Sequence, residues 1–149
     1  MANKKIIIFE GVDCTGKTTL KTNFEELTKY KHVCIDRAFL SQAVYAYLRG
    51  EEKEANEWLE IFVSSASKSS FEYVIVLCTA PTDMIKHVMF DSQHDAFDVE
   101  NHCVVTLRWF SYLKALASGV QNITFSVSEL QYGNWSKARA VNLQKELGL

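Results

Sequence analysis

Residues 9–20, FEGVDCTGKTTL, have the residue types and the spacing of a loop that holds phosphate groups. Gly11 and Gly16 frame the loop, Lys17 and Thr18 follow it, and it lies between an apolar run and a helical pattern. Glycine lets the backbone wrap around an anion, and the amides at a helix N-terminus point toward that anion. The predicted phosphate-binding residues are Gly11, Val12, Cys14, Thr15, Gly16, Lys17, Thr18 and Thr19.

In such a loop, Lys17 would reach the β- and γ-phosphates of a nucleoside triphosphate, and the hydroxyl of Thr18 would bind Mg²⁺. A glycine-rich turn that matches the spacing by chance is the alternative. The chain has no guanine-selecting Asn-Lys-x-Asp stretch, and it is too short for a large mechanical ATPase. A small phosphotransferase is the remaining economical interpretation.

Strands and helices must position these residues at one edge of the protein. Compact apolar runs predict strands, and apolar residues at helical spacing predict helices, with Asp98 as the cap of the longest one. The predicted strands are residues 5–9, 32–36, 73–78 and 122–127, and the predicted helices are 18–29, 39–48, 51–67, 82–89, 99–117 and 135–147. This alternation predicts one α/β domain, residues 1–149, whose parallel sheet binds ligands beyond the carboxyl ends of its strands.

The composition restricts the possible partners. The chain has 149 residues and a net charge of −2 without a basic run, so we do not expect general nucleic-acid binding. No apolar run approaches the ~18 residues that a membrane span needs. The four cysteines lack paired metal spacing, and three lie in or beside apolar stretches, which predicts buried, reduced thiols. We therefore expect a cytoplasmic protein.

Residues 35–50, IDRAFLSQAVYAYLRG, follow the second predicted strand. Together with EGVDCTGKTT at residues 10–19, they resemble the thymidylate kinase family and the related nucleoside and nucleotide kinases. Asp36-Arg37, followed by Ser41 and Tyr45, looks like the family's Asp-Arg-aromatic-x-x-Ser-x-x-Ala-Tyr pattern. The resemblance spans nearly the whole chain. It implies a P-loop NTPase fold with three α/β/α layers, a lid-like loop at about residues 87–98, and ATP and Mg²⁺ as cofactors.

The resemblance also implies roles for single residues. Asp13 would face the acceptor and hydrogen-bond a sugar hydroxyl, and Arg37 would hold the acceptor phosphate through its planar donor fork. Asp36 would lie near Mg²⁺ and its waters. Gln42 would contact the base, and Tyr45 would pack against the deoxyribose. The candidate catalytic residues are Lys17, Asp13, Arg37 and Asp36; the candidate metal ligands are Thr18 and Asp36; the candidate acceptor-binding residues are Arg37, Ser41, Gln42 and Tyr45.

Structural explanations remain open for several of these residues. Asp36 and Arg37 also fit an exposed pair at a strand end, which contributes little to stability. Tyr45 also fits a residue that packs its helix against the sheet, and Ser41 also fits a residue that stabilises the start of its helix.

The chain departs from this family in two places. Only residues 28–32 join the first predicted helix to the second strand, so the element that stacks on thymine and supplies a further arginine is missing. The sheet should therefore have four strands in the order 2-1-3-4. We therefore expect an acceptor pocket that is open on one side, unless Phe39, Trp58 or a partner subunit closes it. The lid-like loop contains His87 and His94 but no arginine, which leaves the predicted site short of positive charge.

We expect transfer of the γ-phosphate of ATP to a deoxynucleoside monophosphate, dTMP or a modified pyrimidine relative. A kinase for a nucleoside or a modified base and a non-catalytic nucleotide-binding regulator are the alternatives. The partner is then a small-molecule nucleotide, with a homodimer through the flanking helices as a further possibility.

Overall fold

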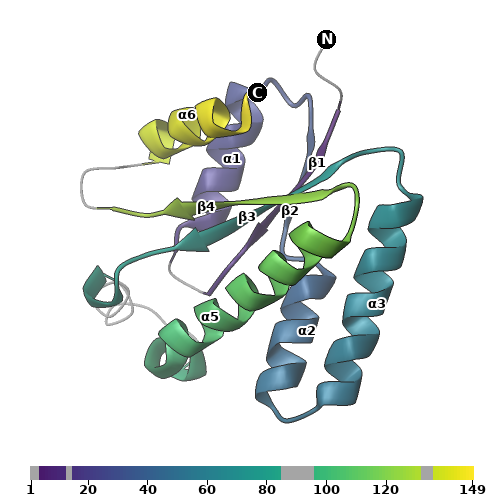
Figure 1. Ribbon diagram of the computed structural model, residues 1–149. Helices are drawn as coiled ribbons and strands as arrows, with labels where there is room; N and C mark the ends of the chain where they lie inside the picture. Colours follow the sequence, from purple (N-terminus) through teal and green to yellow (C-terminus); the bar gives the residue numbers. More distant parts are fainter. Residues whose placement is uncertain (1–3, 13–14, 85–95, 132–135) are drawn as a thin grey trace.

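The computed structural model describes residues 4–12, 15–84, 96–131 and 136–149, with the backbone alone for residues 96–100, 102 and 136. Its centre is a sheet of four parallel strands in the order β2-β1-β3-β4 (Figure 1). The strands are β1 (Ile6–Glu10), β2 (Val33–Asp36), β3 (Tyr73–Thr79) and β4 (Ile123–Glu129). The predicted α/β class, the parallel pairing and the strand order are confirmed.

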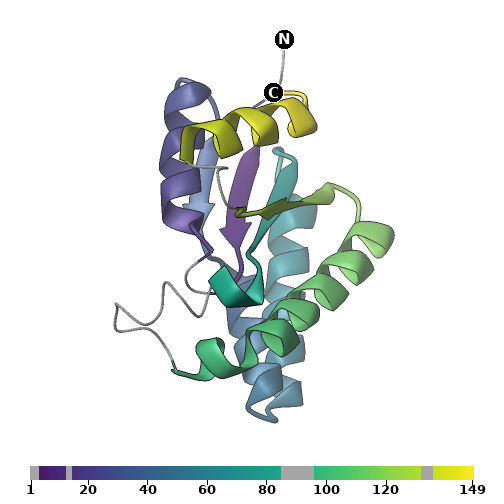
Figure 2. The same ribbon diagram turned by 90° about the vertical axis from the view of Figure 1, so that its left-hand side faces the viewer.

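Helices cover both faces of this sheet (Figures 1 and 2). They are α1 (Lys17–Leu27), α2 (Phe39–Leu48), α3 (Glu52–Lys68), α5 (Ala96–Gly119) and α6 (Ser136–Leu147). On one face, Phe9 of β1 packs with Phe24 of α1 and Leu143 of α6. On the other, Ile8 packs with side chains of α2, α3 and α5, among them Trp109. Because successive strand residues point to opposite faces, one apolar run supplies both cores.

The carboxyl edge of the sheet brings the two sequence motifs together. Phe9 of β1 pairs in register with Asp36 of β2, so both strands end at the same height. The chain leaves β1 at Gly11, whose φ of 132° is rare for a residue with a side chain. A Cβ on Gly11 would lie 2.3 Å from the carbonyl oxygen of Cys78 in β3. Only glycine therefore lets the loop begin this close to the neighbouring strand.

Helix α5 begins earlier than the sequence pattern predicts. It starts at Ala96, so Asp98 lies inside the helix and the predicted cap is wrong. Residues 82–84 are helical, and the rest of the helix predicted for 82–89 lies outside the described residues. Within the described part of the chain, no helix has both the length and the apolar character that crossing a bilayer requires.

The cysteines are only partly buried, contrary to the prediction. Cys78 is buried and Cys34 half-buried, and burial raises the pKa of each thiol to about 11, which disfavours the reactive thiolate form. Cys103 is exposed, so the prediction of a buried thiol is wrong there, because Cys103 lies on an outward face of α5. None of these three forms a disulfide. Cys14 lies outside the described residues.

Candidate functional site

The described part of the loop between β1 and α1 leads directly into the N-terminus of α1. Gly16 adopts the left-handed conformation, with φ 73°, and serves as the N-cap of α1 without a side-chain cap. The first amides of a helix have no intrahelical partners, and the helix dipole makes this end electropositive. An anion held by the loop would therefore meet both the amides and the partial positive charge of α1.

Lys17 is held against its own loop. Its side chain is buried, and Nζ donates to the carbonyl oxygen of Val12 at 2.7 Å. The hydroxyl of Thr15 donates to the same oxygen at 2.8 Å. The ammonium group is thus positioned at the loop backbone, where the predicted phosphates would bind. Thr19, also predicted to bind phosphate, is exposed in the first turn of α1.

Thr18 and Asp36, the two candidate metal ligands, are in contact although they come from different motifs. The hydroxyl of Thr18 donates to Oδ2 of Asp36 at 2.7 Å, and both side chains are exposed. Hydroxyl and carboxylate oxygens are ligands that Mg²⁺ accepts, and Mg²⁺ commonly takes one or two protein ligands together with substrate phosphates and waters. This pair beside the phosphate loop therefore fits Mg²⁺ bound to a triphosphate.

Arg37 lies between the loop and Tyr45 of α2. Its Nη2 donates to the carbonyl oxygen of Gly11 at 3.4 Å, and its guanidinium lies 5.9 Å from the ring centroid of Tyr45. Its φ is 62°, in the left-handed region that non-glycine residues seldom adopt. Its amide still donates to the carbonyl oxygen of Phe9 at 3.0 Å. The backbone therefore turns sharply at Arg37, which is common where structure is held for a function.

A cavity of about 370 Å³ adjoins Arg37 and collects the predicted acceptor-binding residues. Its lining is Arg37, Ala38, Phe39, Ser41, Gln42, Tyr45 and Trp58. Tyr45 agrees with both interpretations made from the sequence, acceptor binding and helix packing. It lines the cavity, and it also packs edge-on against Trp109 of the core. The hydroxyl of Ser41 is hydrogen-bonded to Glu10, which supports its structural explanation as well.

Glu10 is a buried carboxylate that was not among the predicted site residues. It ends β1, is fully buried, and accepts hydrogen bonds from the amide of Ala38 at 2.9 Å and from the hydroxyl of Ser41. Ala38 is the N-cap of α2 but has no side-chain oxygen, so Glu10 supplies the cap from the neighbouring strand. Burial raises the pKa of Glu10 to about 7, and the two hydrogen bonds and Arg37 only partly offset that rise.

Glu10→Gln should change how stability depends on pH. Because the folded state binds the Glu10 proton up to about pH 7, the contribution of Glu10 to the free energy of unfolding should fall as pH rises from 4.5 to 7 and then level off. Glutamine does not ionise. Relative to the unsubstituted protein, the free energy of unfolding of the variant should therefore rise by up to about 3 kcal/mol between pH 5 and 8. Urea denaturation across this range measures the difference.

The exposed Glu57 on α3 provides the matched control. Glu57→Gln removes the same carboxylate from a solvated position, and its stability should follow that of the unsubstituted protein at every pH. Equal pH dependence in Glu10→Gln and the unsubstituted protein would mean that Glu10 is ionised in the folded state well below pH 7.

Arg139 of α6 is a second residue that was not among the predicted ones. It is 2% exposed, and its Nη1 donates to the carbonyl oxygen of Thr15 in the phosphate loop at 2.6 Å. Its Nη2 and Nε donate to the carbonyl and hydroxyl oxygens of Ser128 at 2.7 and 2.9 Å. Burial lowers the pKa of this guanidinium, but arginine keeps its charge in proteins. Arg139 therefore fixes the loop and adds a positive charge behind it.

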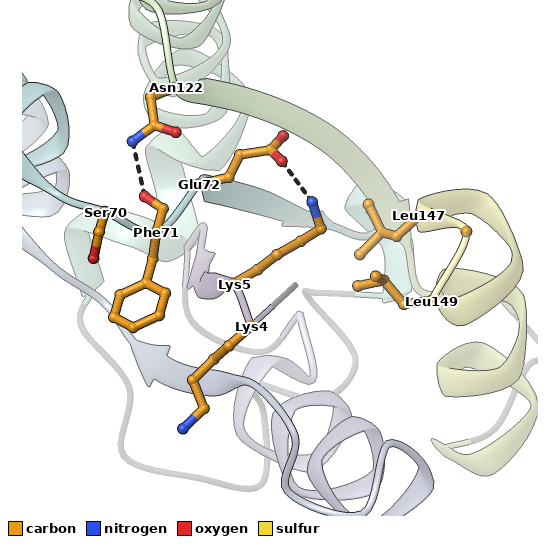
Figure 3. Close-up of a pocket in the computed structure, with 9 residues that line it drawn as sticks. Lys4, Lys5, Ser70, Phe71, Glu72, Asn122, Leu147 and Leu149 are labelled. Atoms are coloured by element: carbon orange, nitrogen blue, oxygen red, sulfur yellow. Dashed lines mark hydrogen bonds and ion pairs between the residues drawn. The ribbon is translucent and has the colours of Figure 1, made fainter. Parts of the chain in front are cut away.

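A second cavity, of about 840 Å³, lies at the opposite edge of the sheet. It is bordered by the segments that precede β1, β3 and β4 and by the C-terminal residues (Figure 3). Its polar groups bind one another: Lys5 pairs with Glu72, and the side-chain amide of Asn122 donates to the carbonyl oxygen of Phe71 at 2.8 Å. These contacts hold strand starts together and are remote from both sequence motifs.

Several predicted participants lie outside the described residues. They are Asp13, Cys14, His87 and His94, together with most of the lid-like loop. The guanidinium of Arg108 on α5, which follows this loop, lies 3.6 Å from the ring centroid of Tyr47 and 5.8 Å from that of Tyr112. It is thus engaged by two aromatic rings.

No family model, curated protein or solved structure matches this chain. The function therefore has to be inferred from the contacts of the loop, of Asp36 and Arg37, and of the cavity beside them.

Proposed function

We propose that this protein is a P-loop kinase that transfers the γ-phosphate of ATP, in the presence of Mg²⁺, to a deoxynucleoside monophosphate. The acceptor is dTMP or a modified pyrimidine relative, as the resemblance of residues 10–19 and 35–50 to thymidylate kinases implies. The observation that carries the proposal is the position of Arg37. Its guanidinium contacts the loop at Gly11 and also lines a cavity whose volume of about 370 Å³ lies in the range of small-ligand sites.

In this proposal the chain acts by positioning and by charge. Lys17 and the amides at the start of α1 hold the donor phosphates, while Arg139 supports the loop from behind. Thr18 and Asp36 offer oxygen ligands on the outer side of the loop. Arg37 holds the acceptor phosphate. When bound there, Mg²⁺ neutralises phosphate charge.

The test is an assay with ATP, Mg²⁺ and a panel of nucleosides and nucleoside monophosphates, followed for ADP and for a phosphorylated acceptor. ADP that forms only with dTMP or a related monophosphate, and not in the presence of EDTA, would support the proposal. A product from a nucleoside but from no monophosphate would overturn the choice of acceptor. Tight ATP binding without acceptor-dependent ADP would overturn the kinase and favour a nucleotide-binding regulator.

A further inference from the structure

Two aromatic rings beside the acceptor cavity are stacked on each other outside the core. Phe39, in the first turn of α2, lies 5.6 Å from Trp58 of α3 between ring centroids, with 27° between the ring planes. Phe39 is 40% exposed and Trp58 is half-buried. Neither ring belongs to the core clusters on the two faces of the sheet. Core packing therefore does not account for this pair.

Both rings line the cavity that contains Arg37. The cavity thus combines a cation with an aromatic wall, and the side-chain amide of Gln42 in the same lining offers a hydrogen-bond donor and an acceptor. Its volume of about 370 Å³ lies in the range of small-ligand sites. A ligand that matches all three features carries an anionic group, a flat ring and a polar ring edge.

The aromatic wall is held in place by its surroundings. The indole N–H of Trp58 donates to Oε1 of Glu54 at 3.4 Å, one turn earlier on α3. On the other side, Phe39 follows Ala38, whose amide is bound by Glu10. Both rings are carried by helices that pack into the core, since α2 buries Leu40 and Val44 and α3 buries Phe62 and Ala66.

We propose that the Phe39–Trp58 stack is the surface on which the base of the acceptor nucleotide lies, with Gln42 contacting the polar edge of a pyrimidine. This inference rests on the proposed function, since it assigns the acceptor to this cavity. Base–aromatic stacking contributes about 1–3 kcal/mol per base, as measured by alanine substitution. The stack then selects for a base, while Arg37 binds the phosphate that every monophosphate carries.

Trp58→Ala and Phe39→Ala should each raise the KM for dTMP about tenfold or more, with the KM for ATP and kcat changed less than about twofold. Phe71→Ala is the matched control, because Phe71 is 39% exposed but lines the cavity at the opposite edge of the sheet. Trp58→Phe keeps an aromatic ring and should restore most of the affinity. Trp58→Leu and Phe39→Leu replace the alanine variants if those do not fold.

Equilibrium dialysis without ATP separates this inference from the proposed function. In the unsubstituted protein, dTMP should bind more tightly than deoxyribose 5-phosphate, which lacks a base. Trp58→Ala should weaken dTMP binding about tenfold and leave the binding of deoxyribose 5-phosphate unchanged. An equal loss for both ligands, or none for dTMP, would overturn the inference even if the kinase assay succeeds. If Trp58→Ala selectively loses dTMP binding but the unsubstituted protein forms no ADP in the kinase assay, the base-stacking inference would be supported and the proposed kinase activity overturned.

Discussion

Replacing Lys17 with methionine should lower acceptor-dependent ADP formation by about 10²–10³-fold or more. Methionine has a similar length but no charge, so the loop would lose the ammonium group that lies against the carbonyl oxygen of Val12. That group is a cation held at the loop, where the proposed kinase would need to stabilise charge on the transferring phosphoryl group. Steady-state rates with saturating ATP and dTMP measure the effect.

Lys21→Met is the matched control for this prediction. Lys21 lies one turn later on α1 and forms an ion pair with Glu25 at 2.9 Å, so the substitution removes the same charge from the same helix. Its rate should stay within about twofold of that of the unsubstituted protein. Similar losses in both variants would point to the net charge of α1, and an unchanged rate in Lys17→Met would remove Lys17 from the catalytic residues.

Arg139→Met should destabilise the protein by about 2–4 kcal/mol, because each buried polar group left without its hydrogen-bond donor costs about 1–3 kcal/mol. The carbonyl oxygens of Thr15 and Ser128 would lose their donors in a buried environment. Methionine fills much of the volume, so the loss reports hydrogen bonds more than a cavity. Urea denaturation measures the change in the free energy of unfolding.

Lys145→Met, at an exposed position of the same helix, is the control and should cost less than about 1 kcal/mol. Arg139 also shapes the phosphate loop, so Arg139→Met should weaken ATP binding in the absence of urea, at a temperature where the variant is still folded. A variant with normal stability and normal ATP binding would show that the contacts of Arg139 are dispensable.

The strands were predictable because their apolar runs are compact. Residues 73–78 and the observed β3 (Tyr73–Thr79) differ by one residue, and the helix predicted at 39–48 matches α2 (Phe39–Leu48). The start of α5 was not predictable from a capping rule, since Ala96 begins the helix although Asp98 offers a cap. Local capping preference is worth only about 1 kcal/mol, which the packing of a long helix easily exceeds.

The site was predictable where a local motif carries it. The contact between Thr18 and Asp36 followed from two motifs at one sheet edge. Glu10 and Arg139 were not predicted because their partners are distant in the chain, and Arg139 lies 124 residues from Thr15. The sequence signal that could have identified Glu10 as a buried polar residue was its position directly after the apolar run of residues 6–9. For Arg139, the signal was its spacing of four residues before Leu143, which places both on one face of α6.

The wide separation of paired strands has a consequence for protein synthesis. Ile6 pairs with Tyr73, and Tyr73 pairs with Ile123. The sheet can therefore form only after the long stretches of chain between these strands have left the ribosome. Gly11 must then pack on the carbonyl group of Cys78, and the loop needs Arg139 from the last helix. The loop between β1 and α1 can therefore take its folded conformation only after Cys78 and Arg139 have both been synthesised.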